Sequence, residues 1–248
     1  MNGFVPLPRR DGLISYRHAD GGLWGTERWG IARGADGRRV LTTHCEMEIG
    51  SDHVVRDSVI SVDAAFQPCD AYVRIMNHGR LTGSGWFRFD QTHAECETFT
   101  AAEGRLSQTI PIQRPIRGFG VHALQSDAWL GADFPFEEGP GHVKFWGQNL
   151  MHSLHHLGAS GPFFATTQSG LEYVGTETVT VPAGTFECRR IRLKGTTNAH
   201  PPYDMWLSTD GDHLYVKGLV EGYMASVFEL EELAGAPIDE QRAPVDAA

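Results

Sequence analysis

The chain has 248 residues, a hydrophobic fraction of 41% and a net charge of −10 at pH 7. This length suits one large β domain or two small ones, and the acidic balance argues against nucleic acid or an acidic membrane surface as a partner. The sequence has no run of about 20 apolar residues, so no membrane span is predicted.

Residues 1–12 form a leader rich in proline, arginine and glycine, which we expect to lie on the surface. The leader lacks the apolar stretch of a secretory signal, which favours a cytoplasmic location. The four cysteines form no C-x-x-C pair, and three of them lie in strand-like runs, as buried reduced thiols often do. They are Cys45, Cys69, Cys96 and Cys188.

From Leu13 to Ile112 the pattern predicts only strands and turns. Residues 40–49 alternate between an apolar face and a polar face that includes His44. A polar face meets either solvent or a polar cavity, so His44 is a candidate acid–base group. Arg56 and Asp57 point opposite ways on the next strand, so one faces inward and needs a partner. We assign Arg56 and the strand residue Trp86 as candidate ligand contacts.

Residues 113–141 are irregular and punctuated by glycine and proline. Long irregular segments inside compact domains often form lids or cavity mouths. His122 is therefore a candidate acid–base group, and Arg117 and Phe119 are candidate ligand contacts. Residues 123–130 are predicted to form a short helix.

The segment Val143–Leu157 fits two patterns. On a helix, its apolar residues share one face and His152, His155 and His156 lie opposite; on a strand, residues 145–152 cross a sheet and a loop follows. Three histidines on one helical face can bind a metal, but the segment has no H-E-x-x-H motif and no carboxylate at a matching spacing. We therefore predict no metal site.

Residues 171–233 read as hairpins. Two β-rich runs flank the turn Pro182–Thr185, and Asp210-Gly211 separates two further runs, which is a strong hairpin signal. Residues 234–248 have the composition of a flexible tail.

The stretches EYVGTETVTVPAGTFECRRIRL and WLSTDGDHLYVKG in this region resemble a bacterial family of unassigned function. Its members are expected to form a long antiparallel sheet rolled into an open barrel, a spiral β-roll. The family is similar in fold to carriers that move lipoproteins across the periplasm, to proteins proposed to bind glycolipids, and to a half-barrel enzyme of violacein biosynthesis. The resemblance is specific over about 171–233 and architectural over 20–125. It implies a cavity, favours the strand-plus-loop pattern for 143–157, and supplies no catalytic motif.

The predicted fold is therefore a single all-β domain over residues 13–233, with many antiparallel strands curled into an open barrel or roll and little helix. Gly37 to Asp63 and Gly184 to Asp210 have the same 26-residue spacing. This suggests an internal duplication with halves at about 13–125 and 140–233, although meandering β chains also repeat such spacings by accident.

The segment from His200 to Trp206 is the favoured catalytic candidate. Pro201 and Pro202 restrict the backbone, so His200 is held in place. In this hypothesis His200 or His122 is the base, Tyr203 polarises an oxygen, Asp204 orients a histidine and Trp206 stacks on a flat substrate.

The first function hypothesis is a cofactor-independent enzyme of the isomerase or lyase type, acting on a small, largely apolar molecule such as an aromatic, terpenoid or steroid. The sequence has no nucleotide-binding or nucleophile-elbow motif, so no cofactor is expected. The alternative is a carrier or sensor that binds a lipid or other apolar ligand. Convergent His, Tyr, Asp or Arg groups in the cavity would favour the enzyme, and a purely apolar cavity the carrier. The oligomeric state stays open, with a homodimer among the alternatives.

Overall fold

The computed structural model describes residues 7–113, 116, 118–195 and 200–238. Across these residues the chain forms one sheet of fifteen strands, one α-helix and two short 3-10 helices, which confirms the all-β prediction. The strands of the first half are β1 (Arg9–His18), β2 (Leu23–Arg33), β3 (Arg39–Ile49), β4 (Asp52–Val62), β5 (Pro68–Asn77), β6 (Arg80–Phe89), β7 (His93–Thr100) and β8 (Gly104–Pro111).

The remaining elements follow an irregular stretch. They are β9 (Phe119–Gly120), α1 (Leu124–Trp129), η1 (Phe136–Glu138), β10 (Val143–Met151), β11 (Ala165–Val181), β12 (Gly184–Lys194), β13 (Tyr203–Ser208), β14 (Tyr215–Val220), η2 (Gly222–Met224) and β15 (Ser226–Ala234).

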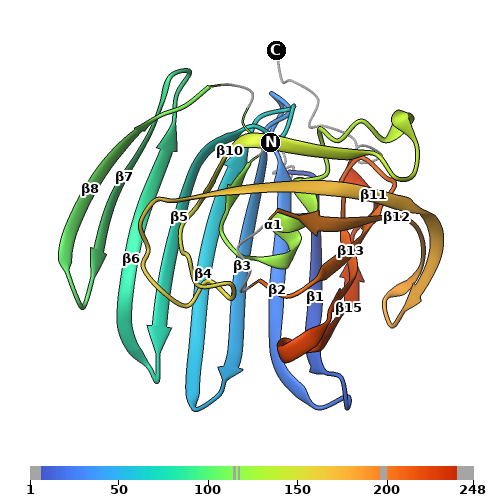
Figure 1. Ribbon diagram of the computed structural model, residues 1–248, viewed down its shortest axis with the longest axis horizontal. Helices are drawn as coiled ribbons and strands as arrows, with labels where there is room; N and C mark the ends of the chain where they lie inside the picture. Colours follow the sequence, from blue (N-terminus) through green and yellow to red (C-terminus); the bar gives the residue numbers. More distant parts are fainter. Residues whose placement is uncertain (1–6, 114–115, 117, 196–199, 239–248) are drawn as a thin grey trace, which may run out of the picture.

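The sheet is built from two antiparallel meanders joined by the pairing of β1 with β15. Strands β1 to β8 follow one another as neighbours, as do β10 to β15, and β1 pairs with β15. The first and last strands of the chain therefore meet in the middle of the sheet, while β8 and the short β9, which runs parallel to β10, form its two edges. Strands β10 and β11 run across the direction of β1 to β8 (Figure 1). A sheet of this size must curl, and this one curls into an open roll.

Alternation along the strands decides which side chains face inward. In β3, Leu41, Thr43, Cys45 and Met47 are buried and the alternate residues Thr42, His44 and Glu46 are exposed, as the sequence predicts. The polar face that contains His44 meets solvent, which settles the choice between solvent and a polar cavity. Each large apolar side chain buried in this way contributes about 1.5–3 kcal/mol to folding, so the alternation fixes the register of the sheet.

The predicted hairpins are confirmed. Pro182 and Ala183 connect β11 to β12, and the turn that contains Asp210-Gly211 connects β13 to β14. Residues 143–151 form strand β10 and are followed by a loop of residues 152–164, so the strand-plus-loop pattern holds and the helical one does not. The backbone of β10 pairs with β11, which overrides its partly helical spacing.

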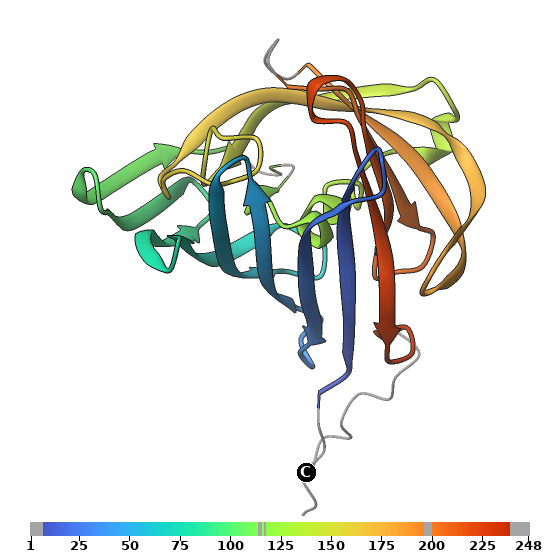
Figure 2. The same ribbon diagram turned by 90° about the horizontal axis from the view of Figure 1, so that it is seen from below.

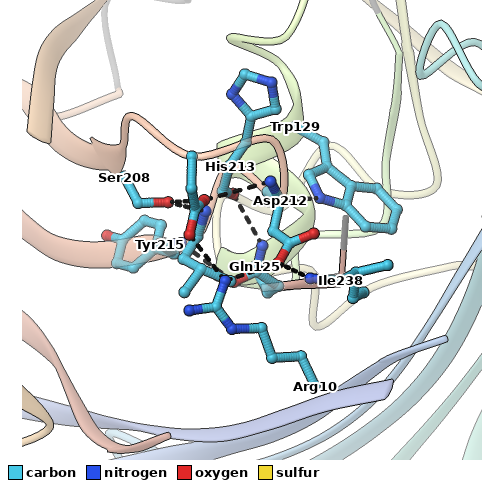
Figure 3. A network of polar contacts seen from close by, with 10 residues as sticks. Arg10, Gln125, Trp129, Ser208, Asp212, His213, Tyr215 and Ile238 are labelled. Atoms are coloured by element: carbon cyan, nitrogen blue, oxygen red, sulfur yellow. Dashed lines mark hydrogen bonds and ion pairs between the residues drawn. The ribbon is translucent and has the colours of Figure 1, made fainter. Parts of the chain in front are cut away.

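Both ends of the predicted domain need correction. Strand β1 begins at Arg9, so residues 9–12 belong to the sheet and not to a surface leader. At the other end Ile238 is buried, and its backbone N–H donates to Asp212 Oδ2 at 3.0 Å (Figure 3). The chain thus stays docked at residue 238, and the rest of the predicted tail lies outside the described residues.

Helix α1 lies inside the roll (Figure 2). A six-residue helix is marginal by itself, and none of its own side chains caps it. Glu27 of β2 supplies the cap: its carboxylate accepts the backbone N–H groups of Leu124 at 2.8 Å and Gln125 at 3.0 Å. A negative charge also suits the positive end of a helix. The anchored helix is what places the adjacent His122 in the interior.

At the other face of α1, Gln125 bridges to β14 by accepting the Tyr215 N–H at 3.1 Å and donating to the His213 carbonyl at 3.1 Å. Trp129 Nε1 donates to the Asp212 carbonyl at 3.1 Å. The helices in the described part of the chain lack the length and apolar character of a transmembrane helix.

Candidate functional site

A cavity of about 240 Å³ lies between the inner face of the sheet, the α1 segment and the 152–164 loop. Most of its wall is apolar and comes from both halves of the chain, including Trp24, Met47, Leu124, Leu150, Met205 and Phe228. Polar side chains interrupt this wall: Tyr16, Arg56, His122, Asp127, Asn149, His156, Thr167, Ser169, His200, Tyr203 and Ser226. An apolar cavity with a small number of placed polar groups is the usual form of a small-molecule site.

Tyr203 lines the cavity, and its phenol pairs with that of Tyr215. Their hydroxyl oxygens are 2.8 Å apart, and either atom can donate. Tyr215 is completely buried, and among the described residues its hydroxyl has no partner other than Tyr203. A buried donor without an acceptor costs about 1–3 kcal/mol, so Tyr215 donates to Tyr203. The hydroxyl hydrogen of Tyr203 is then available to the cavity.

Both phenols stay protonated near neutral pH. Burial is the main cause that raises the pKa of Tyr203 and of Tyr215 well above the ordinary value. Because Tyr203 already accepts one hydrogen bond, its own O–H is the stronger donor. Tyr203 therefore suits a neutral acceptor such as a carbonyl or ether oxygen.

His122 also lines the cavity, in an unusual backbone conformation. Its φ of 56° lies in the left-handed region, which is uncommon outside glycine and often marks a functional position. Its Nδ1 lies 3.2 Å from Nδ1 of the buried His152. Burial, followed by the nearby His152 and Arg56, lowers the pKa of His122 well below its usual value. Burial likewise lowers the pKa of His152 to about 3, so both imidazoles are neutral at pH 7.

Arg56 is the inward-facing member of the Arg56–Asp57 pair. It is 1% exposed, and its guanidinium donates to the carbonyl oxygens of Leu157 and His122 and, at 3.2 Å, to the Sγ of Cys45. These contacts tie the 152–164 loop and the α1 segment to the sheet. The predicted need of a buried charge for partners is met at Nη1 and Nη2 by backbone carbonyls and a thiol, while Nε has no hydrogen-bond partner among the described residues.

Cys45 belongs to a buried polar cluster behind the cavity wall. Its thiol donates to Glu27 Oε2 at 3.2 Å, and the Tyr16 hydroxyl donates to the same oxygen at 2.8 Å. Burial and the Glu27 carboxylate raise the pKa of Cys45 far above its usual value, so the thiol is unreactive. This cluster positions the α1 segment and does not supply a nucleophile.

The 152–164 loop meets η2 at the cavity wall. His156 Nε2 contacts the Sδ of Met224, both of which line the cavity, and the side chain of Leu154 in the same wall is largely exposed. His200 lines the same region, and its Nδ1 is 2.7 Å from the Pro201 carbonyl oxygen. Donation from Nδ1 to that carbonyl leaves Nε2 of His200 as an acceptor, consistent with the predicted restraint by the prolines.

Several predicted site residues lie away from the cavity. His44 is on the outer face, where its Nδ1 is 2.7 Å from the Asp57 carboxylate. Trp86 is also on the outer face, with the Arg88 guanidinium 4.8 Å from its ring centre. Both follow from the two-residue alternation of their strands, which points them to solvent.

Asp204 and Trp206 occupy the face of β13 opposite Tyr203 and Met205. Arg190 and Arg192 hold the Asp204 carboxylate, with Nε–oxygen distances of 2.9 and 2.7 Å, so it does not orient a histidine. Burial acts to raise the pKa of Asp204, but the hydrogen bonds from Arg192 and Arg190 outweigh it and lower the pKa. Trp206 donates through Nε1 to Glu177 at 2.6 Å, which leaves no role in stacking on a cavity ligand.

Phe119 is a core residue. Its ring centre lies 4.7 Å from that of Phe87 and 5.1 Å from that of Phe89, in an aromatic cluster. The neighbouring Gly118 and Gly120 line the cavity in its place. Arg117 lies outside the described residues.

The sequence did not predict several residues at or near the site. Tyr215, Tyr16 and Glu27 carry no motif and lie in ordinary strand patterns, although a glutamate within an apolar alternation such as that of Glu27 is a signal of a buried partner. In the sequence, His152 is notable only as one of three histidines that could bind a metal. In the structure His155 and His156 stack on each other, and the described residues contain no group of three or more His, Cys, Asp or Glu side chains placed to hold a metal.

No protein-family model matches the chain, and no curated protein matches its sequence. Its fold is similar to that of a β-barrel-like protein of domain of unknown function DUF1849 from Brucella abortus, with a TM-score of 0.58 and 8% identity over 94% of this chain and 100% of the other. A DUF1089 family protein from Pseudomonas aeruginosa matches with a TM-score of 0.43 and 9% identity over 87% of this chain and 91% of the other. The first likeness confirms the predicted resemblance to bacterial β-barrel-like proteins of unassigned function, and it concerns the fold alone.

Proposed function

We propose that the protein binds a small, largely apolar and neutral molecule in the cavity, and that a carbonyl or ether oxygen of this ligand accepts a hydrogen bond from Tyr203. The observation that carries the proposal is the phenol pair. The two hydroxyl oxygens are 2.8 Å apart, and donation from the fully buried Tyr215 directs the hydroxyl hydrogen of Tyr203 into a largely apolar cavity.

The size and charge of the cavity support this ligand class. A volume of about 240 Å³ is close to the lower end of small-molecule sites, which suits a ligand of one or two rings. The guanidinium of Arg56 is engaged by two backbone carbonyls and a thiol, so it is poorly placed to pair with an anion. An anionic ligand would therefore lose its hydration here without gaining an ion pair from Arg56, whereas a neutral ligand avoids that cost.

Catalysis is the second candidate, and the cavity meets the criterion given for it, because His, Tyr, Asp and Arg side chains converge there. The neutral imidazoles of His122 and His200 line the same cavity as the Tyr203 donor. In this mechanism a histidine removes a proton from the carbon next to the ligand carbonyl, and Tyr203 stabilises the negative charge that develops on oxygen. Such proton transfer underlies the isomerase or lyase chemistry that the sequence suggests, and it requires no cofactor. The cytoplasmic location and a homodimer stay predictions.

The binding proposal is tested with two probes of matched shape. Titration calorimetry with 2-acetylnaphthalene, which has a carbonyl, and 2-ethylnaphthalene, which does not, measures the contribution of the acceptor. We expect the parent to prefer the ketone by roughly 2- to 10-fold, the effect of one hydrogen bond, and Tyr203→Phe to abolish the preference.

His44→Ala, on the outer face, serves as the matched control and should bind both probes like the parent. If neither probe binds the parent, the cavity does not function as a site for small apolar molecules. If both bind equally well in the parent and in Tyr203→Phe, the assigned acceptor contact is wrong. Native mass spectrometry of the protein isolated from its source cells then identifies the resident ligand, and turnover of that ligand decides between binding and catalysis.

A further inference from the structure

His122 is held more rigidly than its position in an irregular segment suggests. Its backbone is in the left-handed region, and Arg56 binds its carbonyl oxygen. Gly158 of the 152–164 loop packs directly on it: a Cβ at Gly158 would lie 2.6 Å from His122 Cβ. The imidazole therefore has a fixed place at the cavity wall, and the remaining variable is which of its nitrogens carries the hydrogen.

His152, which is completely buried and neutral, determines which ring nitrogen of His122 carries the hydrogen. A neutral imidazole has one N–H and one acceptor nitrogen. Nε2 of His152 lies 3.3 Å from the Gly158 carbonyl oxygen, whereas its Nδ1 lies 3.2 Å from the Gly120 carbonyl oxygen and 3.2 Å from Nδ1 of His122. The single ring hydrogen of His152 is thus either on Nε2, where it faces the Gly158 carbonyl, or on Nδ1, where it faces the Gly120 carbonyl and His122.

Hydrogen-bond satisfaction favours the first arrangement. The Gly120 carbonyl already accepts the backbone N–H of His152 at 3.0 Å, whereas His152 Nε2 is the partner of the Gly158 carbonyl among the described residues. With the hydrogen on Nε2, His152 donates to Gly158 and its Nδ1 accepts from Nδ1–H of His122, so two bonds form. With the hydrogen on Nδ1, the Gly158 carbonyl faces a lone pair and loses its donor, which is costly in a buried site.

We infer that His152 is a positioning residue that keeps the hydrogen of His122 on Nδ1, so that His122 presents an unprotonated Nε2 as a hydrogen-bond acceptor in the cavity. Among the described residues Nε2 of His122 has no hydrogen-bond partner, while Nδ1 is engaged by His152. The inference rests on the proposed function for its ligand, and it narrows the ligand class. The ligand carries a donor, such as a hydroxyl group, in addition to the acceptor that meets Tyr203.

The tautomers are measured directly by long-range ¹H–¹⁵N correlation spectra of protein labelled with ¹⁵N in the histidine rings, without any ligand. We expect the Nδ1–H tautomer for His122 and the Nε2–H tautomer for His152 at pH 7. Assignment uses His122→Asn, because asparagine tolerates the left-handed backbone and keeps an amide near the position of Nδ1 while removing Nε2. His122 protonated on Nε2 in the parent protein overturns the inference, whatever the ligand is.

A second variant tests the positioning role. His152→Phe keeps a ring of similar size but removes the acceptor, so the Nδ1–H tautomer of His122 should no longer be dominant. A purely structural role for His152 would leave the His122 tautomer unchanged. Because this variant can also lose stability through the Gly158 carbonyl, the spectrum of the parent protein remains the deciding measurement.

The ligand class is tested with 2-naphthol, which can donate, and 2-methoxynaphthalene, which cannot, by titration calorimetry. The parent should prefer 2-naphthol by roughly 2- to 10-fold, and His122→Asn should lose this preference while keeping its affinity for 2-methoxynaphthalene. Equal affinity of the parent for both probes overturns the inferred donor and leaves the Tyr203 contact standing. If neither probe nor 2-acetylnaphthalene binds, the proposed function fails, and the tautomer spectra still report on the histidine pair separately.

Discussion

Substitution of Arg10 should lower the free energy of unfolding clearly, because Arg10 belongs to a buried ion pair. Its Nη1 lies 2.7 Å from Asp212 Oδ2 and 2.8 Å from Asp210 Oδ2, and this network joins β1 to the turn before β14 (Figure 3). The side chains of Arg10 and Asp212 are 6% and 1% exposed, and that of Asp210 is 28% exposed. The Arg10–Asp212 pair is therefore buried, and the Arg10–Asp210 pair is partly hydrated.

Arg10→Met keeps most of the side-chain volume and removes the charge. The Asp212 carboxylate would then retain the Ile238 N–H as its partner on Oδ2 in an almost dry site. Removing one member of a buried pair typically costs about 3–5 kcal/mol, whereas the partly exposed Asp210 contact contributes at most about 1 kcal/mol. We expect a loss of about 3–5 kcal/mol in the free energy of unfolding, or a fall of roughly 6–20 °C in the melting temperature.

Urea unfolding followed by tryptophan fluorescence measures the loss, and an unchanged m-value would show that the unfolded state is unaffected. Arg9→Met is the matched control, since the neighbouring Arg9 pairs with Asp11 in solvent and should change stability by less than about 1 kcal/mol. The double variant Arg10→Met with Asp212→Leu should recover most of the loss, because no buried charge is left alone. A change of less than about 1 kcal/mol for Arg10→Met would refute the reasoning.

Three further predictions concern the cavity and its surroundings. Gly158→Ala places a Cβ 2.6 Å from His122 Cβ at a position where φ is +66°. We therefore expect a loss of more than about 1 kcal/mol in the free energy of unfolding and a weaker preference for 2-naphthol over 2-methoxynaphthalene. Parent-like values in both assays would contradict the packing of Gly158 on His122. The folded-state pKa of His152 is about 3 and its unfolded pKa about 6.5, so its contribution to the free energy of unfolding is complete above pH 6.5 and is lost as the pH falls towards 3, by about 1.4 kcal/mol per unit. Urea midpoints at pH 7, 6 and 5 check this, and His152→Phe should reduce the dependence, while the part that comes from His122 remains. Asp204→Asn should leave the affinity for 2-acetylnaphthalene unchanged because Arg190 holds this side chain on the face away from the cavity, and a change of more than 3-fold would restore Asp204 to the site.

Part of the candidate site was predictable because local sequence restricts local backbone. The irregular segment pointed to His122, the paired prolines pointed to His200 and Tyr203, and the strand parity of Arg56 and Asp57 required one inward charge. All except Asp57 line the cavity.

The grouping of Tyr203 with Asp204 and Trp206 shows where closeness in sequence misleads. Successive strand residues point to opposite faces, so only Tyr203 and Met205 reach the cavity, and Asp204 and Trp206 meet the arginines and Glu177 instead. Strand alternation separates these residues in space, although they are close along the chain.

The sequence by itself determined the strands, the hairpin turns and the inward or outward direction of most side chains, since these depend on alternation and on turn residues a few positions apart. Only the tertiary structure decided which inward side chains share one cavity. Leu124 and Glu27 are 97 residues apart, and His122 and His152 are 30 apart, yet each pair is within hydrogen-bonding distance. The physical reason is that the pairing of β1 with β15 and the curl of the sheet bring distant strands together, and no local pattern encodes the extent of that curl.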